Sequence, residues 1–174
     1  MQSEHPHVAF DLFYAENAMP AYRFALRLSG NRDDAEDLAA QALAKAYRRW
    51  SQYKGDSASQ TWLFAIILNE WRMLCRKRPV TETRLDAIQH LASTMRFEDL
   101  DLAAAIQSLP DSLREAFLLV KGEGLTHAEA ARVVKVPVGT MYFRVHSAVR
   151  KLRSSLSVEP ELQALEEVTC NHEM

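Results

Sequence analysis

The side chains best suited to a chemical task lie in one basic stretch near the end of the 174-residue chain. Residues 131–156 contain no Asp or Glu, and their cations are Arg132, Lys135, Arg144, Arg150, Lys151 and Arg153. A solvated helix usually mixes both signs, because opposite charges one turn apart attract each other. A face with charges of one sign repels itself unless a polyanion binds it. The stretch therefore favours nucleic-acid binding over the plain packing of a surface hairpin.

Two helices are predicted within residues 126–156, separated by a tight turn. Thr126 and Glu129 form a capping box, which marks the start of the first helix. Pro137 ends this helix, because proline cannot continue the backbone hydrogen-bond ladder. The second helix begins near Val138 and repeats apolar residues at helical spacing. Its expected buried stripe is Met141, Val145, Ala148 and Leu152.

The opposite face of the second helix is polar and basic, which is typical of a helix-turn-helix DNA reader. Seven residues are expected on or beside this outward face: Thr140, Phe143, Arg144, His146, Ser147, Arg150 and Lys151. Phe143 has an alternative place, packed against the preceding helix over residues 126–134. The segment thus combines a buried stripe with a surface that suits the DNA major groove.

The composition favours a helical globular chain and gives little support to other classes. Apolar residues make up 48% of the sequence, and only five residues are glycine. No run of about 18 apolar residues is long enough to span a membrane, and the first ten residues lack the pattern of a secretory signal. Cys75 and Cys170 lie far apart and make neither a disulfide framework nor a zinc spacing. We therefore expect a protein of the reducing cytoplasm.

Enzymatic chemistry has no supporting pattern in this sequence. We find no nucleophile arrangement, metal-ligand cluster or phosphate-binding loop, and so we predict no catalytic residue, metal or cofactor. His5 and His7 form a short pair near the start of the chain, which solvation explains better than ligand binding.

The net charge of −2 conceals a separation of charges along the chain. Residues 72–78 form a second basic block with four cations. Residues 80–130 contain nine acidic and four basic residues, and the tail after Leu156 contains five glutamates and no Lys or Arg. We therefore expect two basic surfaces joined by acidic chain.

The first predicted helix spans residues 8–29 and ends at Gly30, a residue type common just after a helix C-terminus. Pro20 is expected to kink it. The apolar residues expected inside are Phe10, Phe13, Tyr14, Met19, Tyr22, Ala25 and Leu26.

The second predicted helix spans residues 33–50, with a cap signal at Asp33 and with acids before bases, as the helix dipole favours. Its expected buried stripe is Ala35, Leu38, Ala42, Ala46 and Trp50. The opposite face carries Asp37, Gln41 and Lys45, and spacing alone favours plain solvation for these three.

A third helix is predicted over residues 58–78, after a loop over residues 51–57 and before Pro79. It is rich in apolar residues, so we expect it at the centre of its domain. Asn69 lies within the apolar run, where a neighbouring group could satisfy its amide.

The remaining segments are a linker, two helices and a tail. Residues 80–100 form the linker, which reaches at most about 70 Å when fully extended. Such a reach would let two lobes engage separate sites on one duplex. Helices are expected over residues 101–109 and 111–121, and residues 157–174 form the acidic tail.

Several short motifs occur in an order and at separations that resemble one family. They are Asp34-Ala-Glu-Asp-Leu38, Tyr53-Lys-Gly-Asp-Ser57, Thr61-Trp-Leu63, Ser108-Leu-Pro110, Gly124-Leu-Thr126, Glu129-Ala-Ala131 and Pro137-Val-Gly-Thr140. Each motif alone is a weak signal, whereas the ordered series is specific. Over about residues 8–156 the chain resembles the bacterial RNA polymerase sigma factors of the extracytoplasmic-function (ECF) group.

The resemblance implies an all-α fold with two small helical domains joined by a linker. These are a sigma-two bundle over residues 1–79 and a sigma-four helix-turn-helix domain over residues 101–156. It implies a cytoplasmic protein without catalytic activity that binds core RNA polymerase and directs promoter recognition and transcription initiation. The implied partners are the beta-prime clamp helices, the beta flap, promoter DNA and an anti-sigma protein. The acidic tail belongs to no common pattern.

Roles implied by the resemblance can be assigned position by position. Contacts with the polymerase clamp helices are implied for Asp37, Gln41 and Lys45. Contacts with the promoter minus-ten element are implied for Tyr53, Lys54, Asn69, Arg72, Arg76 and Lys77. Contacts with the minus-thirty-five element are implied for Thr140, Tyr142, Phe143, Arg144, His146, Ser147, Arg150 and Lys151. Asn69 falls where the family reads a flipped-out base, and its amide donor and acceptor suit a base edge.

Two departures from the family pattern affect the expected binding. Ala40 and Gln41 stand where the family usually has Gln-Glu, so polymerase docking is expected to rely more on other contacts. Tyr142 and Phe143 stand where the family often has a cation and a serine, and Ser147 and Val149 where it often has arginine. Fewer guanidinium contacts and more apolar surface predict a different DNA preference, which can include thymine methyl groups.

Two other functions remain open on the sequence. An ordinary helix-turn-helix regulator that acts without polymerase would account for residues 126–156 but not for the loop and basic helix over residues 51–78. A protein adaptor would use the same helices without DNA, and it would show no salt-dependent DNA affinity. The sigma-factor interpretation accounts for both basic regions.

Overall fold

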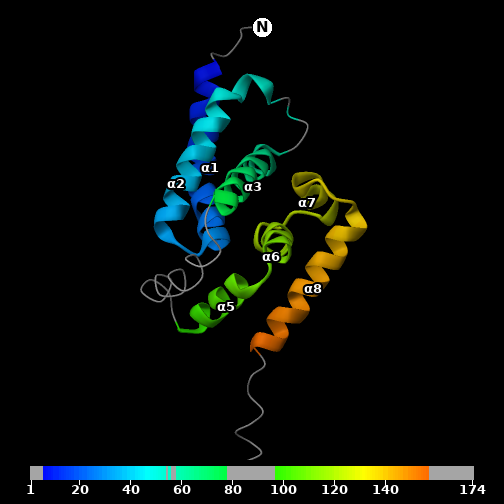
Figure 1. Ribbon diagram of the computed structural model, residues 1–174. Helices are drawn as coiled ribbons and strands as arrows, with labels where there is room; N and C mark the ends of the chain where they lie inside the picture. Colours follow the sequence, from blue (N-terminus) through cyan, green and yellow to red (C-terminus); the bar gives the residue numbers. More distant parts are fainter. Residues whose placement is uncertain (1–5, 54, 56–57, 78–96, 157–174) are drawn as a thin grey trace, which may run out of the picture.

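The computed structural model describes residues 6–53, 55, 58–77 and 97–156, and the regular structure in these residues is entirely helical (Figure 1). Lys54, the linker before residue 97 and the acidic tail lie outside the described residues. None of the described helices is long and apolar enough to cross a lipid bilayer. The described residues also contain no group of three or more His, Cys, Asp or Glu that could hold a metal ion.

Two small helical domains make up the fold, which confirms the predicted class. The N-terminal domain consists of α1 (Pro6–Ser29), α2 (Arg32–Arg48), the short 3₁₀ helix η1 (Trp50–Gln52) and α3 (Ser59–Lys77). The C-terminal domain consists of α5 (Phe97–Ser108), α6 (Asp111–Phe117), the π-helical segment η2 (Leu118–Gly122), α7 (His127–Val134) and α8 (Val138–Leu156).

The N-terminal domain is a three-helix bundle in which α1, α2 and α3 pack against one another. Phe24 of α1 lies against Phe64 of α3 with ring centroids 4.6 Å apart, and neither side chain is exposed to solvent. The prediction that the third helix is central is confirmed. Its buried residues are Leu63, Phe64, Ile66, Ile67, Leu68 and Trp71.

Tyr14 and Met19 of α1 do not lie inside the bundle, which contradicts the prediction for this helix. They are 51% and 62% exposed. The buried stripe of α1 is Phe10, Phe13, Asn17, Ala21, Phe24 and Leu28. Tyr14 and Met19 fall off this stripe by one or two positions and therefore rotate to the solvent side. The prediction is wrong because it counts apolar residues without assigning them a face.

Gly30 ends α1 as predicted, with a φ of 70° that favours glycine. The next helix begins earlier than predicted, directly after its N-cap Asn31. The Asn31 Oδ1 atom accepts hydrogen bonds from the backbone N–H groups of Asp33 (2.9 Å) and Asp34 (3.1 Å). The predicted cap at Asp33 is therefore wrong, because the asparagine amide two residues earlier already satisfies these free donors.

The helix-turn-helix has the predicted start. The Glu129 N–H donates to the Thr126 hydroxyl (3.2 Å), and the Thr126 N–H donates to the Glu129 carboxylate (2.8 Å). α7 ends at Val134, and Lys135 adopts the left-handed conformation with a φ of 61°. The chain has therefore turned before it reaches Pro137, and α8 then packs against α7.

The predicted buried stripe of α8 is confirmed. Met141, Val145, Ala148 and Leu152 are each at most 5% exposed. Ser147, predicted on the outward face, is instead buried. α8 packs against α5 and α6 as well as α7. Its buried arc is therefore wider than one stripe and includes the position next to Ala148.

Two predicted boundaries in the C-terminal domain are wrong by a few residues. α5 begins four residues before the predicted helix, so residues 97–100 belong to a helix and not to the linker. The helix predicted over residues 111–121 consists of α6 followed by η2. There the Glu123 N–H donates to the Leu118 carbonyl (2.9 Å), which widens the last turn into a π-helix.

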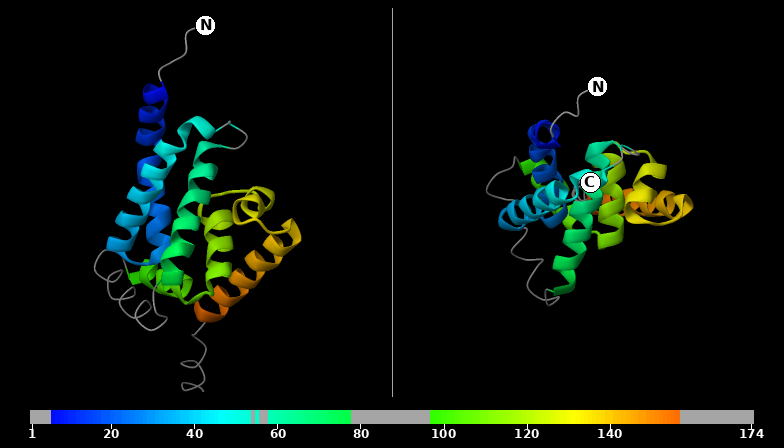
Figure 2. Two further views of the ribbon diagram at one scale, coloured as in Figure 1. Left: turned by 45° about the horizontal axis from the view of Figure 1, so that its top comes forward. Right: turned by 90° about the horizontal axis from the view of Figure 1, so that it is seen from above.

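The two domains lie side by side, with α3 between the other N-terminal helices and the C-terminal domain (Figure 2). α3 packs against α7, and α1 packs against α5 and η2. No sequence pattern predicts this contact, because the linker length is equally compatible with two separate lobes.

Side chains of the C-terminal domain complete the end of α1. The Gln107 Nε2 atom donates to the Arg27 carbonyl (2.8 Å), and the Arg114 Nη1 atom donates to the Leu28 carbonyl (3.0 Å). The last carbonyl groups of a helix have no partner within the helix, so these buried side chains supply partners from across the domain boundary. Gly30 leaves room for this contact, since a Cβ there would lie 2.7 Å from the Gln107 side chain.

Two ion pairs also cross the domain boundary. Arg27 of α1 pairs with Glu123 after η2. Arg72 of α3 binds Glu115 of α6 through both Nε (2.9 Å) and Nη2 (2.5 Å). The Glu115 and Glu123 side chains are only 5% and 8% exposed. Carboxylates so buried lose most of their hydration, and each one depends on its arginine.

The Glu123 carboxyl should make stability depend on pH. Burial raises its pKa, and attraction to Arg27 offsets this only in part. Between the unfolded-state pKa and this raised pKa, the folded protein binds more protons than the unfolded protein, so the free energy of unfolding falls as the pH rises. Glu123→Gln should remove that fall. Urea unfolding of the variant and the wild type between about pH 2.5 and pH 7, on both sides of the ordinary glutamate pKa, measures the difference.

Glu129→Gln is the matched control for this experiment. Hydrogen bonds from Thr126 lower the pKa of the Glu129 carboxyl. Its contribution to stability is present above the unfolded-state pKa and is lost as the pH falls through the lowered folded-state pKa. The two variants should therefore change the pH dependence in opposite directions. The same direction for both would contradict the conclusion that burial dominates at Glu123.

Candidate nucleic-acid interface

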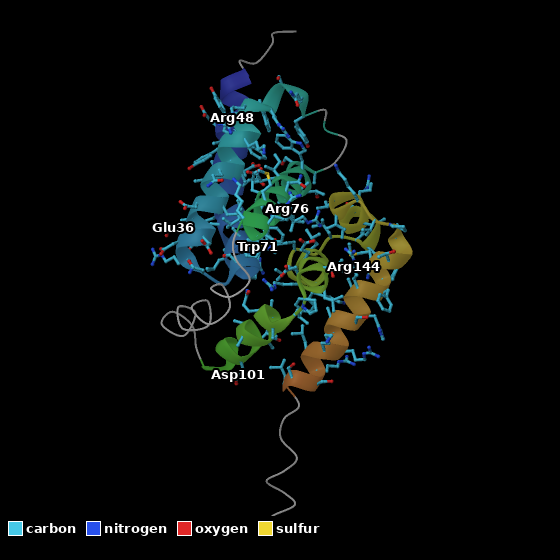
Figure 3. The ribbon with its side chains drawn as sticks, in the orientation of Figure 1. Glu36, Arg48, Trp71, Arg76, Asp101 and Arg144 are labelled. Carbon is cyan, nitrogen blue, oxygen red and sulfur yellow. The ribbon has the colours of Figure 1, made fainter. Side chains whose placement is uncertain are left out.

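The predicted base-reading residues of α8 lie mostly on the solvent side of that helix. Tyr142 and Phe143 are 57% and 68% exposed. The other exposed candidates are His146, Arg150 and Lys151, and the half-buried ones are Thr140 and Arg144. Figure 3 shows Arg144 on α8, well away from the labelled residues of α3. Ser147 is the one candidate on this helix that does not reach the surface.

The two aromatic side chains of this face, Tyr142 and Phe143, differ in how the rest of the protein holds them. The rings of Tyr142 and His127 stack with centroids 4.0 Å apart and an angle of 10° between their planes. The alternative in which Phe143 packs against the preceding helix is wrong, because its side chain is exposed. α8 therefore presents one ring fixed by α7 and one free ring beside its cations.

A groove beside the Tyr142 ring has no acidic side chain among the described residues that line it. Its lining includes Lys121, His146, Arg150 and Arg153. In the described part of the chain, no carboxylate forms an ion pair with a cation of residues 131–156. Among the described residues, no ion pair therefore compensates the positive charge of this surface, which suits a phosphate backbone.

The predicted minus-ten residues of α3 line a second groove, at the domain boundary. Asn69, Arg72 and Arg76 lie along one wall, and Asp111 and Glu115 of α6 form the other. The groove has a volume of about 670 Å³. The sequence predicts the cations but not the facing carboxylates, because Arg72 and Glu115 lie 43 positions apart in different domains.

Arg72 already has a partner in this conformation. Its guanidinium binds the Glu115 carboxylate, and this hydrogen bonding raises the pKa of Arg72 above its ordinary value. Asn69, Arg76 and Lys77 are exposed, although the Arg76 Nε atom also donates to the Arg72 carbonyl (3.2 Å). Figure 3 marks Arg76 on α3, near the buried Trp71. The face predicted to meet the minus-ten element therefore points toward the C-terminal domain.

An aromatic cluster supports the loop after α2, and the sequence reasoning missed it. The Tyr53 ring lies 5.5 Å from that of Trp50 and 5.2 Å from that of Trp62. The Phe13 ring lies 4.8 Å from Trp50. Trp50 joins this cluster from η1, after α2 has ended at Arg48, and it still packs against the core as a partly buried residue. Aromatic residues on both sides of the loop were the available signal.

The polar face of α2 is available to a partner at two of its three predicted residues. Asp37 and Gln41 are exposed. Lys45 pairs with Glu70 of α3 (2.5 Å), and its side chain is 28% exposed. Plain solvation, favoured by spacing, is therefore wrong for Lys45, which ties α2 to α3.

Models of known protein families match both domains. The family described as Sigma-70 region 2 matches residues 13–79, and the family described as Sigma-70, region 4 matches residues 99–152. The first match covers most of the bundle with the α3 groove, and the second covers the helix-turn-helix. A helix-turn-helix regulator that acts without polymerase would leave the first match unexplained.

Individual relatives extend this similarity over most of the chain. The ECF RNA polymerase sigma factor EcfG of Rhodopseudomonas palustris is 35% identical over 149 residues, which cover 82% of this chain and 82% of the relative. The ECF RNA polymerase sigma-E factor of Escherichia coli is 32% identical over 133 residues, which cover 66% of this chain and 70% of the relative.

Solved structures resemble the whole two-domain arrangement. The sigma factor RpoE of Bartonella quintana, solved in complex with the anti-sigma factor NepR, has a TM-score of 0.71 and 26% identity, and the match covers 87% of this chain and 99% of that one. CnrH, solved in complex with the cytosolic domain of CnrY, has a TM-score of 0.67 at 23% identity, which shows the fold alone. With two family regions in order and a relative matched along most of its length, the chain belongs to the ECF RNA polymerase sigma factors, which direct transcription initiation.

Proposed function

We propose that this sigma factor reads its promoter through two separate surfaces, one on each domain. The position of the cations carries the proposal: uncompensated positive charge lines α8, and a second set of cations lines α3. Both sets lie within the regions matched by the sigma-factor families. A duplex held at two places by one subunit fixes the position of the polymerase, and hence the start of transcription.

The C-terminal domain places α8 in the major groove of the minus-thirty-five element. Arg144, Arg150 and Lys151 supply charge for phosphates, and a guanidinium can also bind guanine with two hydrogen bonds. The exposed ring of Phe143 suits a thymine methyl group. The stack with His127 holds Tyr142 in place before DNA arrives, which lowers the entropy lost on binding. Ser147 is buried and is not among the proposed contacts.

The N-terminal domain acts on the minus-ten element through α3 and the loop before it. The Asn69 amide offers a donor and an acceptor to the edge of a flipped-out base. Arg76 and Lys77 hold backbone phosphates, and Arg72 joins them once it leaves Glu115. Tyr53, fixed by the aromatic cluster, contacts the edge of the opened strand, and the same role is proposed for Lys54 from the family resemblance alone.

The polymerase is the platform for both contacts. Asp37 and Gln41 face the clamp helices of the beta-prime subunit, while Lys45 acts indirectly by holding α2 on α3. The C-terminal domain contacts the beta flap. We also infer an anti-sigma protein as a regulator, supported by the RpoE–NepR complex of the structural neighbour. The protein has no catalytic activity of its own and works in the bacterial cytoplasm.

Arg150→Ala and Arg144→Ala should each weaken binding to the upstream promoter element by about 1–3 kcal/mol where the guanidinium reaches a base edge. Promoters are first mapped by transcription with core polymerase, and duplex binding is then measured by fluorescence anisotropy. Arg32→Ala, an exposed arginine on α2, is the control and should bind as the wild type does. Unchanged binding in both α8 variants would remove the assignment of this face.

Asn69→Ala should leave binding to the duplex upstream element intact and lower open-complex formation by about 10-fold, because only the melted strand meets its amide. Permanganate reactivity of unpaired thymines, measured with core polymerase on the mapped promoter, reports opening. Met73→Ala, on the same groove, is the control. Equal loss at both steps would contradict the division of roles, and a wild-type chain that starts no transcription with core polymerase would refute polymerase docking.

A further inference from the structure

We propose that the free protein masks its own minus-ten surface, with the Glu115 carboxylate in the place that a DNA phosphate takes on Arg72. The inference rests on the proposed role of Arg72 as a phosphate contact. It adds a competition: promoter DNA and α6 of the same chain bind the same guanidinium, so they exclude each other.

The geometry of the pair matches phosphate recognition. Arg72 binds the two carboxylate oxygens of Glu115 with two nitrogens, at 2.9 Å and 2.5 Å. Carboxylates and phosphates both offer paired oxygens to this planar fork. The Glu115 side chain is 5% exposed and the Arg72 side chain 35% exposed. A phosphate can take up this contact through Nε and Nη2 only by displacing the carboxylate.

The groove around the Arg72–Glu115 pair also carries negative charge that disfavours DNA binding. One wall carries the proposed DNA contacts Asn69, Arg72 and Arg76, and the facing wall carries Asp111 and Glu115. A polyanion that enters this groove meets the Glu115 carboxylate bound to Arg72, and Asp111 on the same wall. Like charges repel one another. The described residues that line the groove beside α8, by contrast, include no acid.

The contacts that hold the domains together can be exchanged for water. Gln107 and Arg114 bond to backbone carbonyls of α1, and Arg27 pairs with Glu123. When the domains part, water reaches the freed groups and takes the place of each partner, which offsets part of the free energy lost with each contact. Relative motion is the usual expectation for two domains of one chain. A polyanion that binds Arg72 therefore competes directly with the closed form.

DNA binding by the full-length chain, without polymerase, tests the masking. The probe is a fluorescein-labelled, mixed-sequence single-stranded DNA of about 20 nucleotides, followed by anisotropy at low salt. Glu115→Gln should bind it about 3- to 10-fold tighter than the wild type, because Arg72 is released. Glu36→Gln is the control: it removes the same charge from an exposed ion pair with Arg32, and its affinity should rise less.

The Arg72→Ala background separates masking from a general change in net charge. There the gain from Glu115→Gln should vanish, since no guanidinium remains to be released. A gain no larger than that of Glu36→Gln, or one that persists without Arg72, overturns the masking. Should Glu115→Gln not fold, Glu115→Asp shortens the side chain that holds Arg72 and should show a smaller gain with the same dependence on Arg72, and the absence of that gain overturns the masking equally.

The two proposals fail in different ways. If Arg72→Ala alone binds the probe as tightly as Glu115→Gln does, then Arg72 is not a phosphate contact and the proposed function of α3 is wrong. If Arg72→Ala binds more weakly than the wild type and Glu115→Gln binds no tighter, then the DNA contact stands and the masking is wrong.

Discussion

The buried guanidinium of Arg114 is the interaction on which the arrangement of the two domains depends. An interior guanidinium must find partners for its N–H groups, because it has lost the water that would otherwise bind them. Arg114 is 5% exposed and donates to the carbonyls of Leu28, Gln107 and Leu109 and to Asp111. One side chain thus joins the end of α1, the end of α5 and the start of α6.

Glu115, the residue next to Arg114, links this domain contact to the proposed DNA-binding surface. With α6 placed by Arg114, the adjacent Glu115 faces α3 and meets Arg72. The position of α6 that lets Arg114 bond to the last carbonyls of α1 therefore also puts Glu115 on Arg72 and covers the minus-ten surface. The outward face of α8 stays exposed to solvent. Under the proposed masking, the free protein can bind an upstream element before it can bind a melted strand. The position of one domain thus controls whether the DNA surface of the other is available.

The helix-turn-helix could be predicted because its signals are local: a capping box, a proline and an apolar stripe within one short segment. Choices that depend on neighbours could not be predicted. Asn31 and Asp33 are both good caps, and only the path of the chain after α1 selects the first. Ser147 is buried because three helices surround α8. The Arg72–Glu115 pair joins two domains across a linker, and each charge alone is ordinary for its position, so neither spacing nor composition indicates that they meet.

The distance between the two domains in solution tests most directly whether the free chain is closed and opens on its polymerase. Spin labels at Arg48→Cys in α2 and Ser155→Cys in α8, in a chain that also carries Cys75→Ser and Cys170→Ser, report this distance by pulsed electron resonance. We predict one narrow distribution of distances in the free chain, at the separation that the closed structure sets, and a different distribution after core RNA polymerase is added. The same distribution in both states, or a broad one in the free chain, would contradict a protein that holds its own DNA surface closed.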